Sequence, residues 1–368
     1  MQSKRFRILF AGGGTGGHLF PGIAIADEIK KIRPDAEITF VGTRNKIEAR
    51  VVPQRGYAFA PIWISGFRRR LSADNLLFPL KTIVALMQSF ILILKIRPAV
   101  VVGTGGYVCG PVIFAASLLG IPTLIQEQNS YPGVTTRLLA GWATEVHVTF
   151  ESSLRYLKRT DNVKVTGNPT RATLGTVTRL ESAKFFNVDP QKPTLLVFGG
   201  SLGARSINDA ILAIVDKVAG DHVQMIWQTG ESDFDRVKQR LGDGYPDVRL
   251  YKFIDQMQHA YAVCDLIVSR AGATSVAEIA RAGVPSILVP YPHAAADHQT
   301  ENARAMVEFG ASVMIKDDEL ATRLPGTIQE LLGNPERRNG MAEKAKAMGK
   351  PGAAPALAQA VITLATTS

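Results

Sequence analysis

The sequence predicts an α/β protein with two Rossmann-type domains in tandem, and three observations lead to this prediction. The chain has 368 residues, a length that fits two domains better than one. Short apolar runs alternate with helical patterns, which is typical of a parallel sheet covered by helices on both faces. The order of elements in the first half also recurs in the second half, with glycine-rich turns at equivalent places.

In the first half, apolar runs alternate with segments of helical character. Strands are expected at residues 7–11, 38–41, 99–102 and 123–126. Helices are expected at residues 21–32, up to about residue 95, and at residues 111–119. Each expected strand is short and apolar, so the first sheet should be buried on both faces.

The second half repeats this plan. A strand at residues 194–198 leads into a glycine-rich turn at residues 199–204, as the strand at 7–11 leads into Gly12–Gly17. The change of domain is expected near residues 165–169, which gives a first domain of residues 1–165 and a second of residues 166–350. Ligands of such sheets bind beyond the carboxyl ends of the strands, so the glycine-rich turns are the first candidates for a site.

The first turn, Gly12-x-Gly14-x-x-Gly17, matches the dinucleotide-binding fingerprint. The fingerprint also needs a carboxylate at the end of the second strand, where this chain has Gly42-Thr43-Arg44. That disfavours NAD, whereas Arg44 leaves NADP somewhat more open. Tight strand–helix connections also need glycine, but four such turns (residues 12–17, 103–106, 199–204 and 272–273) favour close approach of a ligand.

Several polar residues lie beside these turns and have two interpretations each. His18 directly follows Gly17 and is suited to general-base work, although a histidine at a helix start is often a cap or a surface residue. Glu127 and Asn129 end an apolar strand; Asn129 suits a sugar hydroxyl, and Glu127 is a second possible base. Ser275-x-x-Glu278 reads as a capping box, but Glu278 could instead bind the two hydroxyls of a ribose.

The charge of the chain is concentrated in one half. The formal net charge is +10, which calls for an anionic partner such as nucleic acid, a membrane or a phosphorylated substrate. Residues 1–165 contain 21 Lys and Arg against 10 Asp and Glu, a net of +11, and the remainder is close to neutral. The basic first half therefore predicts one anion-facing surface.

One segment of the first half combines cations with apolar residues. The most apolar stretch, the thirteen residues 82–94, is too short to cross a bilayer, and most of it is expected in the core. The entry to this helix suits a membrane surface better than single-stranded nucleic acid, because interleaved aromatic residues are missing. The expected membrane contacts are Arg68, Arg69, Arg70, Leu76, Leu77, Phe78, Leu80 and Lys81.

Other classes of site find little support in the sequence. Two cysteines far apart fit a reducing compartment and not a disulfide scaffold. No P-loop, C-x-x-C or H-E-x-x-H pattern occurs. No cofactor and no metal are therefore expected.

Ordered motifs along the chain resemble a known family. These are Gly13–His18, Gly103–Tyr107, Gln126–Asn129, Gly167–Arg171, Gly199–Ala204, Phe253–Asp255, Arg270–Ala273 with Glu278, and Asp297–Gln299 with Asn302. The combination, from about residue 6 to 310, closely resembles the MurG family of bacterial cell-wall N-acetylglucosaminyltransferases. Asp255-Gln256, where the family often has two acids, departs from the pattern.

The resemblance implies a GT-B fold, in which two Rossmann-like domains face a cleft and a last helix, here about residues 351–368, returns to the first domain. It also implies an inverting, metal-independent transfer of GlcNAc from UDP-GlcNAc to undecaprenyl-diphospho-MurNAc-pentapeptide (lipid I), giving lipid II for peptidoglycan synthesis. The second domain would hold the donor. The first would face the acceptor and an anionic membrane, placing the enzyme on the cytoplasmic face of the plasma membrane.

The family pattern also implies roles for single residues. The backbone of Ile254 would meet uracil, Glu278 the ribose, and Ser201 and Arg171 the diphosphate. The sugar would meet Asn129, Ala273 and Gln299, and the opposite side of the cleft would be lined by Thr15, Gly16 and Gly17. His18 is the preferred base, with Glu127 behind it.

Three rival functions remain at this point. A UDP-GlcNAc 2-epimerase would use the same donor but would leave the basic, apolar segment unexplained. An NADP-dependent oxidoreductase would account for the first turn and not for the later three. A non-catalytic lipid- or nucleic-acid-binding protein would account for the charge alone.

Overall fold

The computed structural model describes residues 6–66, 77–220, 222–242, 244–294 and 297–367. Contacts between residues divide the chain into two compact units. Unit 1 comprises Met1–Ala172 and Pro351–Ser368, and unit 2 comprises Thr173–Lys350. The division lies seven residues beyond the boundary expected after residue 165. Arg68, Arg69, Arg70 and Leu76, expected at a membrane, lie outside the described residues.

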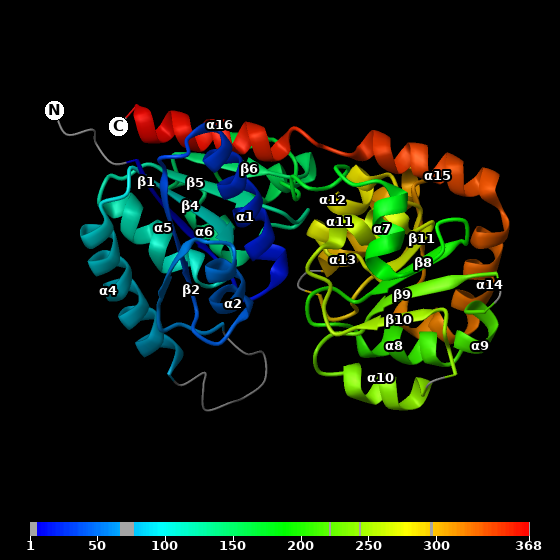
Figure 1. Cartoon of the computed structure of the whole chain (residues 1–368). Coiled ribbons are helices and arrows are strands. Elements are labelled where there is room, and N and C mark those ends of the chain that lie inside the picture. The colour runs from blue at the N-terminus through cyan, green and yellow to red at the C-terminus, as the bar shows by residue number, and fades with distance from the viewer. Residues whose placement is uncertain (1–5, 67–76, 221, 243, 295–296, 368) are drawn as a thin grey trace. The chain divides into compact units, whose positions relative to one another are not determined.

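Unit 1 is built on a seven-stranded sheet in the order β3-β2-β1-β4-β5-β6-β7 (Figure 1). All its paired strands are parallel. The strands are β1 (Arg7–Gly12), β2 (Glu37–Gly42), β3 (Ala58–Pro61), β4 (Val100–Gly105), β5 (Thr123–Glu127), β6 (Glu145–Val148) and β7 (Val163–Val165). The central strands β1 and β4 are buried almost throughout, as their apolar sequences predict.

Helices connect these strands. They are α1 (Gly16–Ile32), α2 (Ile47–Gln54), α4 (Phe78–Ile96), α5 (Cys109–Leu118), α6 (Val134–Leu139) and the 3₁₀ helix η1 (Glu151–Tyr156). The last helix of the chain, α16 (Ala353–Thr366), packs against α1 and β4. Leu357 and Val361 of α16 are fully buried, so the C-terminal segment is part of the unit 1 core.

Unit 2 contains a six-stranded sheet in the order β10-β9-β8-β11-β12-β13, again parallel. Its strands are β8 (Thr194–Phe198), β9 (Gln224–Gln228), β10 (Val248–Tyr251), β11 (Leu266–Arg270), β12 (Ser286–Val289) and β13 (Ser312–Met314). Its helices are α7 (Arg179–Phe186), α8 (Arg205–Leu212), α9 (Val215–Val218), α10 (Phe234–Leu241), α11 (Met257–Val263), α12 (Ala273–Ala282), α13 (His298–Glu308), η3 (Asp317–Glu319), α14 (Leu320–Gly333) and α15 (Pro335–Met348).

The two sheets share one topology. The order β10-β9-β8-β11-β12-β13 repeats the first six positions of the sheet in unit 1. The prediction of two Rossmann-like parallel-sheet domains is therefore confirmed. In each sheet the strand order reverses between the two central strands, β1 and β4 or β8 and β11. Three glycine-rich turns follow β1, β8 and β11, whereas residues 103–105 of the fourth form the end of β4 itself; all four lie at the point where ligands of open α/β sheets bind.

Helix α4 differs from the expectation that most of residues 82–94 lie in the core. It is longer than the apolar run, at 19 residues, and buries only Lys81, Ala85, Ser89 and Ile93. Spacing of four residues places these side chains on one stripe, which faces α5. The opposite stripe is apolar and exposed, and consists of Leu80, Ile83, Met87, Ile91 and Leu94. The interpretation as a core helix was wrong.

Two further expectations about this helix need correction. Among the described helices, α4 alone is long and apolar enough to cross a membrane by length and composition, so the thirteen-residue count underestimated it. Lys81 was expected at the surface, but it is only 8% exposed and donates a hydrogen bond to Ser65. Its ammonium also lies 5.8 Å from the centre of the Trp63 ring. Lys81 therefore ties α4 to the body of unit 1.

Candidate active site

The first glycine-rich turn joins β1 to α1 and has no room for a side chain at its first two residues. A Cβ atom at Gly12 would lie 2.0 Å from Thr104 Oγ1, and one at Gly13 would lie 2.6 Å from the Glu48 carboxylate. Gly14 has a φ of +86°, which favours glycine. Helix α1 starts at Gly16 without a side-chain cap. Thr15 and Gly17 are exposed beside it, whereas Gly16 is buried.

The second turn, after β4, lies directly against the first. Gly105 and Gly106 have φ values of +101° and +78°. A Cβ atom at Gly106 would lie 2.5 Å from the Gly13 carbonyl oxygen, and one at Gly105 would lie 2.6 Å from His18 Nδ1. The two turns of unit 1 therefore meet backbone to backbone. This contact requires glycine for steric reasons.

Glu48 fixes the first turn and was not identified from the sequence. Its side chain is fully buried. Oε2 accepts a hydrogen bond from the Gly14 N–H at 3.0 Å, and Oε1 accepts from the N–H and the hydroxyl of Thr43 at 3.0 and 2.8 Å. One carboxylate thus joins the turn after β1 to the end of β2. A single Glu in a short helix carries no pattern that reveals this contact.

His18 lies in the first turn of α1 and is half-buried. Its Nδ1 is 2.9 Å from Gln128 Oε1, and its backbone carbonyl accepts a hydrogen bond from Thr104 Oγ1 at 2.8 Å. Gln128 lies in the Gln126–Asn129 motif, but the sequence indicates no role for it. The histidine is thus tied to the ends of β4 and β5 and is neither a helix cap nor a loose surface residue.

Glu127 does not have the surroundings expected of a base. It is only 3% exposed. One oxygen accepts from the N–H and the side-chain amide of Asn129, and the other accepts from the Gly133 N–H and the Thr136 hydroxyl, at 2.6–3.1 Å. Four donors hold this carboxylate, so both of its oxygens are engaged by neighbouring residues. Glu127 therefore organises the segment after β5, and His18 stays the candidate base.

Two further candidates also lie in unit 1. The side-chain amide of Asn129 donates to Glu127 Oε1, which fixes its orientation beside the carboxyl end of β5. Arg171 was expected to serve the donor domain, but contacts assign it to unit 1. Its guanidinium lies 4.4 Å from the centre of the Phe20 ring on α1.

In unit 2, the turn after β8 has the same glycine constraint. Gly200 and Gly203 have φ values of +86° and +79°, and a Cβ atom at Gly203 would lie 2.0 Å from the Thr229 carbonyl oxygen. Ser201 is half-buried in this turn. Helix α8 follows with Ala204 as its N-cap and no side-chain cap. Its first N–H groups therefore form the kind of helix N-terminus that attracts anions.

Gln228 joins this turn to the predicted uracil segment. Its side-chain N–H donates to the Gly200 carbonyl at 3.0 Å, and its Oε1 accepts from the Ile254 N–H at 2.8 Å. Ile254 was expected to meet a base through its backbone. Because its N–H is engaged by Gln228, the remaining backbone group for a ligand is the carbonyl oxygen.

The capping-box interpretation of Glu278 was wrong. Helix α12 begins at Ala273 with Gly272 as its N-cap, so Ser275 already lies inside the helix. The buried Glu278 side chain instead accepts a hydrogen bond from the Tyr261 hydroxyl at 3.2 Å. Its orientation is therefore set by α11 and not by its own helix terminus.

The remaining donor candidates lie at the adjoining strand ends. Ala273 is buried at the start of α12. Gln299 Oε1 accepts from the Tyr291 N–H at 3.0 Å, which links α13 to the segment after β12. Asn302 is fully buried on α13 and donates to the Ala271 carbonyl at 3.1 Å. These contacts hold α13 against the turn after β11.

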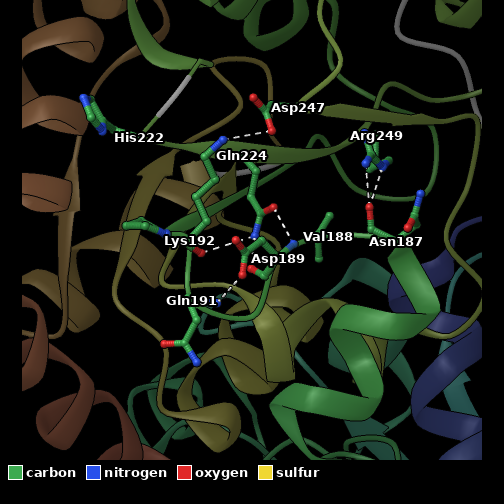
Figure 2. Close-up of a pocket in the computed structure, with 10 residues that line it drawn as sticks. Asn187, Val188, Asp189, Gln191, Lys192, His222, Gln224, Asp247 and Arg249 are labelled. Atoms are coloured by element: carbon green, nitrogen blue, oxygen red, sulfur yellow. Dashed lines mark hydrogen bonds and ion pairs between the residues drawn. The ribbon is translucent and has the colours of Figure 1, made fainter.

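A pocket of about 720 Å³ lies on the opposite side of the unit 2 sheet from the glycine-rich turns, beside the amino ends of β8, β9 and β10 (Figure 2). Its polar groups bind one another. Lys192 pairs with Asp247 at 3.0 Å, and both ends of the Gln224 amide are engaged, with the backbone of Asp189 among their partners. Arg249 donates to the Asn187 carbonyl. We interpret this pocket as structural, because ligands of such sheets bind at the carboxyl ends.

Metal and thiol chemistry find no support in the described part of the chain. No group of three or more His, Cys, Asp or Glu side chains that could hold a metal ion occurs among the described residues. Cys109 and Cys264 are both buried. Burial raises the pKa of the Cys109 thiol to about 12, which suppresses the reactive thiolate.

The role of Glu48 can be tested by Glu48→Gln. The amide has one oxygen, so one buried N–H, that of Gly14 or that of Thr43, loses its acceptor. We expect the free energy of unfolding to fall by about 1–3 kcal/mol, with faster hydrogen exchange at residues 13–18. Glu151→Gln, an exposed control, should change stability by less than about 0.5 kcal/mol. Equal effects of the two substitutions would contradict the role of Glu48.

Comparisons with known proteins agree with this architecture. Residues 8–148 match the glycosyltransferase family 28 N-terminal domain, and residues 194–357 match the C-terminal domain of that family. A curated relative from Salinibacter ruber is 45% identical over 366 residues, which cover 99% of this chain and 98% of the relative. It is named UDP-N-acetylglucosamine–N-acetylmuramyl-(pentapeptide) pyrophosphoryl-undecaprenol N-acetylglucosamine transferase.

Comparison with solved structures distinguishes similarity of fold from membership of the same family. The crystal structure of Acinetobacter baumannii MurG aligns with a TM-score of 0.71 at 28% identity, covering 97% of this chain and 99% of that one. A UDP-GlcNAc 2-epimerase from Neisseria meningitidis aligns with a TM-score of 0.66, over 97% and 100% of the two chains, but at only 14% identity. The epimerase therefore shares the fold alone. By its full-length relatives and both domain matches, the chain belongs to glycosyltransferase family 28, among the N-acetylglucosamine transferases named above.

Proposed function

We propose that this enzyme transfers GlcNAc from UDP-GlcNAc to the 4-hydroxyl of MurNAc in undecaprenyl-diphospho-MurNAc-pentapeptide, so that lipid I becomes lipid II. The observation that carries the proposal is 45% identity over 99% of the chain to a curated transferase with this name. The glycine-rich turns and their polar neighbours, which lie at the strand ends where ligands of such sheets bind, support it.

The reaction needs one in-line displacement. The acceptor hydroxyl oxygen forms a bond to C1 of GlcNAc, the bond from C1 to the UDP oxygen breaks, and the configuration inverts. The hydroxyl proton passes to a base, and negative charge accumulates on the departing diphosphate. Two groups are therefore needed: a base on the acceptor side and positive potential on the donor side.

Unit 2 supplies the donor side in this proposal. The uncapped N-terminus of α8 and the turn around Ser201 would receive the diphosphate, because backbone N–H groups there stabilise negative charge. Glu278 would bind the ribose, and the Ile254 carbonyl would accept from the uracil N–H. Ala273 and Gln299 would contact the sugar.

Unit 1 supplies the acceptor side. His18 would take the proton, and Thr15, Gly16, Gly17 and Asn129 would contact the substrates. The family pattern gives Arg171, which belongs to unit 1 by its contacts, a role at the diphosphate. The base belongs on this side because the acceptor, and not the donor, loses a proton.

A transfer assay tests the reaction. Full-length enzyme with labelled UDP-GlcNAc and a short-chain lipid I analogue should give the labelled disaccharide product together with UDP. A reaction without acceptor serves as the control and should leave UDP-GlcNAc unchanged. Formation of the 2-epimer in that control, with no disaccharide in the full reaction, would reject the transferase in favour of the epimerase.

Glu278→Ala tests the donor site. Loss of the hydrogen bonds that the ribose hydroxyls would donate to the Glu278 carboxylate should weaken UDP binding about tenfold or more, measured by calorimetry. Tyr261→Phe is the matched control, because it removes the hydroxyl that touches Glu278 and keeps the carboxylate; it should change UDP affinity much less. Unchanged UDP affinity in Glu278→Ala would show that the carboxylate is only structural.

We further propose that unit 1 binds the cytoplasmic face of the plasma membrane peripherally, through the outer stripe of α4. The stripe is formed by Leu80, Ile83, Met87, Ile91 and Leu94. Large exposed apolar surfaces mark interaction sites. Because the inner stripe of α4 packs on α5, the helix would lie on the bilayer and not cross it.

The charge around α4 favours an anionic lipid surface. No Asp or Glu occurs between Asp74 and Glu127, a segment that includes α4 and α5. Lys95 and Arg97 are exposed at the end of α4. Each cation near an anionic surface contributes about 1 kcal/mol. The neighbouring α5 and α6 regions add the exposed side chains of Leu118, Leu138 and Trp142.

Leu94→Gln tests this surface. Its side chain is 61% exposed, and loss of its insertion should weaken binding to phosphatidylglycerol-containing vesicles by roughly tenfold, equivalent to about 1.5 kcal/mol. Leu180→Gln is the matched control, since Leu180 is 60% exposed on α7 of unit 2. Transfer to a soluble acceptor should be unaffected by either change. Equal vesicle binding by both variants would place the membrane contact elsewhere.

A further inference from the structure

Three residues of unit 1 form a closed ring of hydrogen bonds beside the first turn. His18 Nδ1 lies 2.9 Å from Gln128 Oε1, and Gln128 Nε2 donates to the Thr104 carbonyl at 2.7 Å. The Thr104 hydroxyl in turn donates to the His18 carbonyl at 2.8 Å. The ring joins α1, β4 and the end of β5, so both backbone and side chain of His18 are held.

The ring fixes the orientation of the Gln128 amide. Gln128 Nε2 faces two backbone carbonyls, which can only accept hydrogen bonds: that of Thr104 at 2.7 Å and that of Gln126 at 3.2 Å. A flipped amide would place its oxygen against these two oxygens. Gln128 is only 2% exposed, so water does not relieve such a clash. The amide oxygen must therefore face His18.

An amide oxygen facing Nδ1 determines where the imidazole proton lies. The oxygen is an acceptor only, so Nδ1 must carry the hydrogen, and in the neutral ring Nε2 then has the lone pair. We infer that Gln128 is a positioning residue that holds neutral His18 in the tautomer protonated on Nδ1. This inference rests on the proposed function in one respect, namely that His18 accepts the proton of the acceptor hydroxyl.

The backbone at Gly105 packs closely against the His18 imidazole and restricts where the ring can lie. Gly105 lies so close that a Cβ atom there would be 2.6 Å from His18 Nδ1 and 3.0 Å from Cε1. Among the described residues, none forms a hydrogen bond with Nε2. In the reaction the proton would move from the acceptor oxygen to Nε2, and the charge of the imidazolium would be stabilised by the Nδ1–H bond to Gln128. Gln128 itself is buried and acts only through His18.

The tautomer can be measured without any turnover. Full-length enzyme labelled with ¹⁵N-histidine contains six histidines, and the His18 signals are those that vanish in His18→Gln. At a pH where His18 is neutral, we expect the nitrogen shifts and couplings of an imidazole protonated on Nδ1. A wild-type His18 protonated on Nε2 would overturn the inference.

Two substitutions of Gln128 distinguish the effect of its hydrogen bond to His18 from the effect of its side-chain volume. Gln128→Leu removes the acceptor, so the Nδ1 tautomer should lose its dominance and kcat should fall on the order of tenfold or more, with KM for UDP-GlcNAc within about twofold. Gln128→Glu keeps an oxygen facing His18, and in its protonated form it can still donate to the Thr104 carbonyl. It should keep the Nδ1 tautomer and more activity than Gln128→Leu. An unchanged tautomer in Gln128→Leu would overturn the inference.

Gln224→Leu is the matched control. Gln224 is also 2% exposed and uses its side-chain oxygen and nitrogen in hydrogen bonds, but it lies in unit 2 beside the pocket of Figure 2. Its loss should leave the His18 tautomer unchanged. A general effect of losing a buried glutamine would appear in both variants and would overturn the specific role of Gln128.

These measurements also distinguish failure of the proposed transfer reaction from failure of the inference about Gln128. If wild-type enzyme makes no disaccharide, the proposed transfer fails, and the nitrogen spectra still decide the tautomer. If His18→Gln is fully active, His18 is not the base, and the catalytic part of the inference is overturned with it. A fall of kcat in Gln128→Leu together with loss of the Nδ1 tautomer supports both.

Discussion

Both units depend on one steric constraint: the turn after the first central strand, β1 or β8, lies against the end of a neighbouring strand, β4 or β9, with no room for a side chain between them. In unit 1, Gly106 meets the Gly13 carbonyl oxygen at a distance that no Cβ atom could occupy, and Gly203 meets Thr229 in the same way in unit 2. Glycine also allows the left-handed backbone at these positions. The close approach leaves backbone groups, and not side chains, exposed at the end of the strands where ligands of open α/β sheets bind.

The turns and segments that follow the strands are held in place by buried polar side chains, which form hydrogen bonds with their backbone. Glu48 holds the turn after β1, and Glu127 holds the segment after β5. Gln228 performs this task in unit 2, between Gly200 and Ile254. Removal of one partner leaves a buried donor or acceptor unsatisfied, which costs about 1–3 kcal/mol. The turns therefore stay ordered although glycine gives them little intrinsic stiffness.

The sequence predicts the parts that follow from local pattern and misses those that follow from packing. Strand β8 has the predicted bounds, and α8 starts directly after the predicted turn at residues 199–204, because apolar runs and glycine turns are local signals. The role of Glu48 depends on contact with Gly14, 34 residues away, which no local pattern encodes. The capping-box interpretation of Glu278, one of two that the sequence left open, rested on residue spacing without knowledge of where α12 begins.

Helix α4 shows why apolar composition alone cannot separate a core from a surface. Its inner stripe holds small or polar side chains such as Ala85 and Ser89, which let the helix pack closely on α5, while Ile83 and Ile91 point outward. This is the reverse of a surface helix in water. With 22 Lys and Arg against 10 Asp and Glu, unit 1 has a net charge of +12, whereas unit 2, with 20 against 22, has −2. Helix α4, with its large apolar side chains exposed, and the excess of cations occur in the same unit. The proposed bilayer contact would accommodate both, because its apolar interior would receive the apolar side chains and its anionic headgroups would attract the cations.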